Sequence, residues 1–155
     1  MECEICGRKF TDIVVCSAGP YICKSCGKKP GIVIIRKICT QSASKNPIEI
    51  AIVMMDAPVI LMHEADHHCV VAAALAAAYK NCGGDINLKE VLDEVIKRGT
   101  ILPYGICAEI GICGGVASAG IFYSILAKTK LTSVNEWGEG KRLVAQCIME
   151  ISKIS

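Results

Sequence analysis

The run of residues 70–79 constrains the fold of this chain most strongly, because it favours a helix and carries almost no bulk. It reads Val-Val-Ala-Ala-Ala-Leu-Ala-Ala-Ala-Tyr, and alanine has the highest helix propensity of any residue. Alanines on several faces let a second helix approach closely. Residues 114–128 begin Gly-Gly-Val-Ala-Ser-Ala-Gly-Ile and have the same character. We therefore predict a central helix over residues 59–81 that packs against a helix over residues 114–128.

The remaining helices are predicted from capping signals. Asn46-Pro47 is typical of a helix start, and the pairs Asn87/Glu90 and Ser133/Glu136 resemble capping boxes. The predicted helices span residues 30–40, 48–55, 88–98 and about 134–152, with a loop over 100–111. The expected fold is mainly α, a helical bundle over residues 30–155.

Two cysteine pairs precede this bundle and predict a small zinc ribbon over residues 1–29. Cys3-x2-Cys6 and Cys23-x2-Cys26 are separated by sixteen residues. Each pair suits a tight turn, so that four thiolates can complete a tetrahedral Zn²⁺ site. Short hairpin strands are expected between the pairs. We expect this zinc to stabilise a segment too short to bury its own core, although a rubredoxin-like iron site would use the same ligands.

The composition indicates which cellular compartment and which kinds of partner to expect. The chain has 155 residues, eleven cysteines and a formal net charge of +2. An odd cysteine number without an export signal argues against a disulfide framework and favours reduced thiols in a cytoplasmic protein. The charge shows no basic surplus of the kind that binds nucleic acid. No apolar run is long and uninterrupted enough to predict a membrane span.

All three histidines lie in one short segment, residues 63–68. His63 and His67 are four residues apart and would share one face of a helix, where paired imidazoles are good ligands for zinc or iron. Asp66 borders that face, and His68 is rotated by about 100° from His67. Asp66, Glu64 and His68 are therefore candidates for proton transfer or substrate binding around a metal held by the other two histidines.

A cysteine and glycine segment supplies the expected second half of this site. Cys107 and Cys113 are candidate metal ligands or a redox pair. Cys113 immediately precedes a predicted helix, where the dipole and the free backbone amides favour the thiolate. Gly114 and Gly115 would let the backbone approach a bound group or anion, or they would simply permit close helix packing. The second site is predicted to hold Zn²⁺, or Fe in mononuclear or iron–sulfur form.

Several of these motifs together resemble an uncharacterised prokaryotic domain family of unknown function. The similarity lies in residues 62–68, 78–84, 102–107, 111–115 and 120–125 and in Trp137-Gly138. Members occur alone, or in chains described as SAM-dependent methyltransferases, mostly in anaerobes and methanogens. The family pattern is closer to H-x-x-[Asp/Glu]-H-H, which implies that Asp66 rather than Glu64 is the working acid. The resemblance covers most of the chain, including its cysteine-rich start.

The sequence thus predicts a cytoplasmic metalloprotein for redox, sulfur or one-carbon chemistry, or for cofactor delivery to a partner enzyme such as a methyltransferase. Two alternatives remain open. Residues 63–67 match H-E-x-x-H, the pattern of metal-dependent hydrolases in which the glutamate is the general base. In the second alternative, the protein is a non-catalytic adaptor that binds another protein. Homo-oligomers could form through the small-residue helices.

Overall fold

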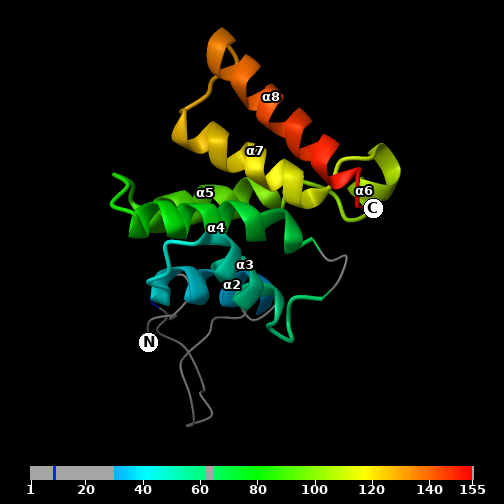
Figure 1. The fold of residues 1–155 in the computed structure, drawn as a ribbon. Coiled ribbons are helices and arrows are strands. Elements are labelled where there is room, and N and C mark those ends of the chain that lie inside the picture. The colour runs from blue at the N-terminus through cyan, green and yellow to red at the C-terminus, as the bar shows by residue number, and fades with distance from the viewer. Residues whose placement is uncertain (1–8, 10–29, 62–64, 155) are drawn as a thin grey trace.

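The computed structural model describes Lys9 and residues 30–61 and 65–154, and that part of the chain is built from helices (Figure 1). The prediction of a mainly α fold is confirmed. The zinc ribbon predicted for residues 1–29 lies outside the described residues. The helices are α2 (Pro30–Gln41), α3 (Pro47–Met55), α4 (His67–Asn81), α5 (Leu88–Gly99), α6 (Ile106–Ile110), α7 (Gly114–Leu126) and α8 (Val134–Ile151).

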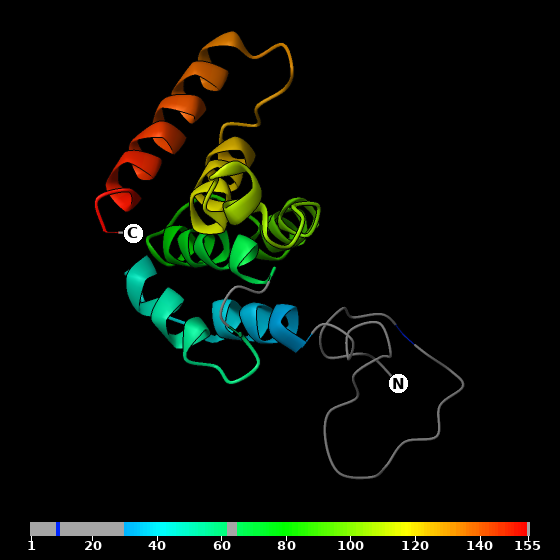
Figure 2. The same ribbon diagram turned by 90° about the vertical axis from the view of Figure 1, so that its right-hand side faces the viewer.

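The helices form three layers with α4 at the centre. Helices α2 and α3 lie on one side of α4 and α5, and α7 and α8 lie on the other (Figures 1 and 2). The predicted packing of α4 against α7 is confirmed and is the most extensive helix pair in the described chain. Helix α4 also packs against α2, α3 and α5, so it is covered on several sides.

Small residues make this central position possible. Six alanines of α4 are at most 4% exposed: Ala72, Ala73, Ala74, Ala76, Ala77 and Ala78. Ser118 of α7 is fully buried, and its hydroxyl oxygen accepts a hydrogen bond from the Ala72 backbone N–H at 2.8 Å. On the opposite side, the Cys39 thiol of α2 donates to the Ala73 carbonyl at 3.4 Å. Close backbone approach therefore joins all three layers.

Local capping signals determine several helix ends as predicted. The Asn46 side chain accepts a hydrogen bond from the Ile48 N–H, and the Asn87 side chain accepts one from the Glu90 N–H. The chain leaves α4 through Gly83, whose φ of +93° suits glycine best. These ends need no tertiary contact, which is why the sequence alone predicts them.

Two predicted boundaries were wrong. The central helix begins at His67 rather than at residue 59, because residues 56–61 form turns such as the bond from the Ile60 N–H to the Ala57 carbonyl. Ile60 is buried against the first turn of α2, where its Cδ1 would lie 3.0 Å from a Cβ at Gly31. That contact takes the chain away from the axis of α4. The predicted loop over residues 100–111 contains the short helix α6.

Helix α8 differs from the rest of the bundle because none of its residues is buried. Within the described chain it packs extensively against α7 and against no other helix. Large apolar side chains stay exposed near and within it, including Leu131, Val134 and Met149. None of the helices in the described part of the chain is long and apolar enough to cross a membrane.

Candidate functional site

The candidate site lies where the start of α4 meets the start of α7. His68 is the second residue of α4 and is only 6% exposed. Its ring lies directly on Gly114, the first residue of α7: a Cβ at Gly114 would meet the Cδ2 atom of the ring and lie 2.9 Å from its Nε2. Only glycine leaves room for the imidazole at this point. The small residue that was predicted to allow helix packing therefore also makes space for a histidine.

The Nδ1 atom of His68 is sealed from solvent and has no hydrogen-bond partner among the described residues. Nδ1 of an imidazole is always either a donor or an acceptor. Leaving such an atom unpaired in a protein interior costs about 1–3 kcal/mol. Buried histidines are usually satisfied by a carbonyl, a carboxylate or a metal ion. His68 is thus the buried polar side chain near this junction whose partner the described residues do not supply.

Cys113 directly precedes Gly114 and is the N-cap residue of α7. Its side chain is half-buried and lies over the first turn, since its Sγ would be 3.7 Å from a Cβ at Gly115. It makes no side-chain capping bond. A thiol at a helix start is close to free amide groups and to the positive end of the dipole, which favours the thiolate form that binds metals.

The neighbours of His68 do not face α7. His67 is half-buried, and its Nε2 lies 3.1 Å from the Leu61 carbonyl oxygen. The carboxylate of Asp66 lies against Gly31 in the first turn of α2, where a Cβ on the glycine would meet its Oδ2 atom. A negative group beside the start of a helix is favourable. Asp66 and His68 therefore point to opposite layers.

The structure does not gather the whole predicted ligand set. Cys107 is exposed on α6. His63, Glu64 and the four ribbon residues Cys3, Cys6, Cys23 and Cys26 lie outside the described residues. Within residues 30–61 and 65–154, no three His, Cys, Asp or Glu side chains are grouped so that they could hold a metal ion. The described part thus supplies one histidine and one cysteine at the α4–α7 junction.

Two close contacts near this junction were not predicted. A Cβ at Gly99, the last residue of α5, would lie 3.0 Å from the His68 carbonyl oxygen and 2.5 Å from the Cys69 sulfur. Ser118 binds the backbone of α4 one turn beyond His68. A buried serine among alanines and a glycine at a helix end were the available signals, but neither shows from sequence which helix it contacts.

The fold and the junction define a helical domain with a buried histidine packed on the start of a small-residue helix. The family of unknown function DUF5714 matches residues 35–155, and the chain belongs to this family. The match begins at residue 35, so it does not extend over the cysteine-rich start as the resemblance implied. Neither a curated protein nor a solved structure matches the chain.

Proposed function

We propose that this protein is a metal-binding protein with a second metal site centred on His68 and Cys113, in addition to a zinc ribbon formed by Cys3, Cys6, Cys23 and Cys26. The observation that supports the second site is the buried ring of His68, whose Cδ2–Nε2 edge lies on Gly114, the residue that follows Cys113. One imidazole and one thiolate suit Zn²⁺ or Fe²⁺ and leave coordination positions for further groups.

The segment before α4 is the best source of the remaining ligands. His63 and Glu64 precede His68 by five and four residues in the sequence. This version of the site differs from the sequence prediction, since His68 replaces His67 as the histidine at the start of α7, Cys107 is left out, and Glu64 is considered as a ligand. His67 is replaced because its ring is already bonded to the Leu61 carbonyl, whereas the Nδ1 atom of His68 has no hydrogen-bond partner among the described residues.

A site of this kind would perform redox, sulfur or one-carbon chemistry, or would pass a cofactor to a partner enzyme such as a methyltransferase. Imidazole and thiolate ligands suit such roles, because they bind both zinc and iron. The hydrolase alternative depends on Glu64, which lies outside the described residues. That alternative and the adaptor alternative stay predictions.

Metal content measured on the full chain tests the proposal. Anaerobic purification followed by elemental analysis should give about two metal ions per chain, one for each site. Replacing zinc by Co²⁺ should add thiolate-to-cobalt absorption for both sites. A single metal that is lost only when the four ribbon cysteines are replaced would exclude the second site.

Matched variants locate the second metal. Cys113→Ser and His68→Asn should each remove about one metal ion per chain. Cys147→Ser is the control, because Cys147 is also a half-buried free thiol but lies on α8. His67→Asn separates the two histidines: metal retained in His67→Asn and lost in His68→Asn supports this ligand assignment, and the reverse result overturns it.

A further inference from the structure

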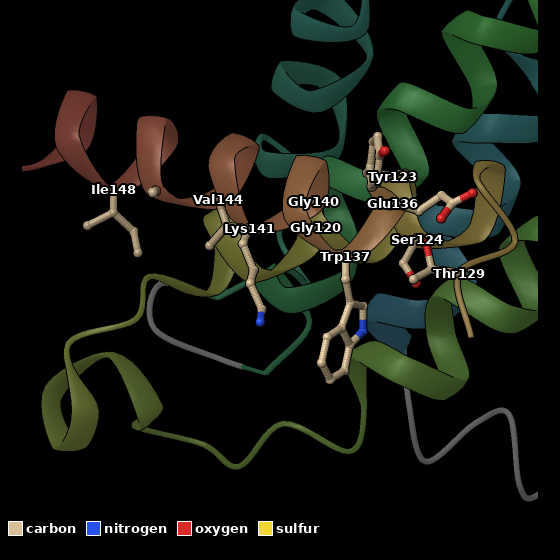
Figure 3. Close-up of a pocket in the computed structure, with 11 residues that line it drawn as sticks. Gly120, Tyr123, Ser124, Thr129, Glu136, Trp137, Gly140, Lys141, Val144 and Ile148 are labelled. Atoms are coloured by element: carbon tan, nitrogen blue, oxygen red, sulfur yellow. The ribbon is translucent and has the colours of Figure 1, made fainter. Parts of the chain in front are cut away.

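A cavity of about 370 Å³ opens between α7 and α8, away from the histidine site (Figure 3). Its size is within the usual range for small-molecule pockets. Apolar atoms form most of its wall. Val144 and Ile148 lie toward one end, and Ser124, Thr129 and Glu136 lie toward the other, with Trp137 between the two groups. Ala145 also lines the cavity.

Two close helix contacts give this cavity a defined shape. A Cβ at Gly120 of α7 would lie 2.8 Å from Val144 Cγ2, and a Cβ at Gly140 of α8 would lie 3.2 Å from the Tyr123 ring. The Tyr123 hydroxyl also donates a hydrogen bond to Glu139 of α8. The helices therefore touch at two glycines and a side-chain bond, and the space between them is a hollow in a packed interface.

Polar side chains form one end of the cavity. The Thr129 hydroxyl oxygen is sealed from solvent and has no hydrogen-bond partner among the described residues. Ser124 beside it accepts a bond from Arg98 at 3.0 Å and keeps its remaining lone pair and its proton. Glu136 brings a carboxylate to the same end of the cavity, and Lys141 brings an ammonium group to its lining.

The position of the Glu136 carboxylate in the cavity lining follows from a capping box that does not form. The sequence predicts reciprocal bonds between Ser133 and Glu136 at the start of α8. In the structure Ser133 makes no side-chain capping bond, and its hydroxyl oxygen instead accepts from the Lys130 N–H at 3.0 Å. Glu136 lines the cavity instead. Ser133 and Glu136 therefore do not form the predicted capping box, and Glu136 contributes a hydrogen-bond acceptor to the cavity.

We propose that the α7–α8 cavity binds a small amphiphile with an apolar body and a head group that donates hydrogen bonds, such as an amine or an alcohol. The body would lie along Val144, Ala145 and Ile148. The head would donate to Glu136, beside Ser124. An anionic head is disfavoured there by the carboxylate. This assignment goes beyond the metal sites and does not depend on them.

The only tryptophan of the chain lines the cavity, so its fluorescence reports binding at this place. The full-length protein is titrated with three probes that share one body: 1-hexylamine, 1-hexanol and hexanoate. We expect a saturable change of Trp137 emission with the amine or the alcohol, and about tenfold weaker binding of hexanoate, the loss for one charge-assisted hydrogen bond. Equal binding of all three probes, or none at all, overturns the proposal.

Variants separate the cavity from general surface binding. Glu136→Gln should weaken the amine about tenfold. Glu150→Gln removes the same charge from an exposed position on α8 that pairs with Lys153, and it should bind all probes as the parent does. Lys141 lies over the Trp137 ring, with its Nζ atom 4.4 Å from the ring centroid. If the protein prefers hexanoate and Lys141→Gln removes that preference, the head group binds at Lys141 and the assignment is refuted.

Discussion

The imidazole of His68 rests on the backbone of Gly114, with its Nε2 only 2.9 Å from the position that a Cβ on Gly114 would take. The histidine that starts the central helix and the glycine that starts its main partner therefore occupy one shared space. A change at either residue moves the other.

Gly114→Ala should destabilise the protein by about 1–3 kcal/mol, the usual cost of adding a methyl group to a packed interior. The added methyl group cannot be accommodated unless the His68 ring moves. Urea denaturation followed by circular dichroism measures the change in the free energy of unfolding. Gly115→Ala is the matched control, because its Cβ would make ordinary contacts of 3.5 and 3.7 Å; an equal loss in both variants would contradict this explanation.

Gly31→Ala should also destabilise the protein, because the new methyl group would displace the Asp66 carboxylate from the first turn of α2. We expect a loss of about 1–3 kcal/mol. Gly138→Ala is the control, since a Cβ at Gly138 meets nothing within 4 Å and alanine inside a helix is favoured over glycine by roughly 0.5–1 kcal/mol. The prediction fails if thermal denaturation shows that both variants gain stability.

Ala77→Leu should cost about 1–3 kcal/mol by overpacking. Ala77 is fully buried in a helix that is packed by α2, α3, α5 and α7, so no side is free to accept the larger side chain. Ala108→Leu adds the same atoms at an exposed position of α6 and should leave stability nearly unchanged. Melting temperatures of the two variants, compared with the parent, check the prediction.

Cys39 should be much less reactive than the exposed thiols of the described chain. Burial raises its pKa from 9.0 to about 12, whereas Cys82 and Cys107 are exposed. A thiol reagent at pH 9 followed by peptide mass mapping should modify Cys82 and Cys107 rapidly and Cys39 only on unfolding. Early labelling of Cys39 in the folded protein would show that its burial is not maintained in solution.

The same shift gives stability a definite dependence on pH. The unfolded thiol loses its proton above about pH 9, while the folded thiol keeps it up to about pH 12. The unfolded state therefore binds fewer protons between these values, and stability falls as pH rises, by up to about 1.4 kcal/mol per pH unit from this group. Cys39→Ala removes the titration, so the slope of unfolding free energy against pH above 9 should be shallower than in the parent.

The sequence predicted those parts of the fold that depend on local signals. Asn46, Asn87 and Gly83 fix helix ends through bonds or dihedral angles within a few residues, and the predicted ends were confirmed there. The small residues of α4 and α7 predicted their partnership because few other segments allow such close approach. The predicted start of α4 was wrong because Ile60 packs against α2. This contact joins residues that are distant in the sequence, so the hydrophobic periodicity does not reveal it.

The choice between the two adjacent histidines shows the same limit. Helical geometry fixes the rotation from His67 to His68 but not which of them faces α7. That depends on where α7 lies and on the space above Gly114. Helical spacing therefore indicated that a histidine faces the cysteine-glycine segment, and packing determined that it is His68.

Helix α8 has a separate consequence for how the molecule opens. Because none of its residues is buried and it rests on α7, it can swing away while the six alanines of α4 remain covered by α2, α3, α5 and α7. Its amides should then exchange with deuterium through this partial opening, faster than those of α4. A molecule bound between α7 and α8 would hinder this partial opening. Slower amide exchange along α8 would therefore report that the α7–α8 cavity is occupied, even for a compound that leaves the tryptophan emission unchanged.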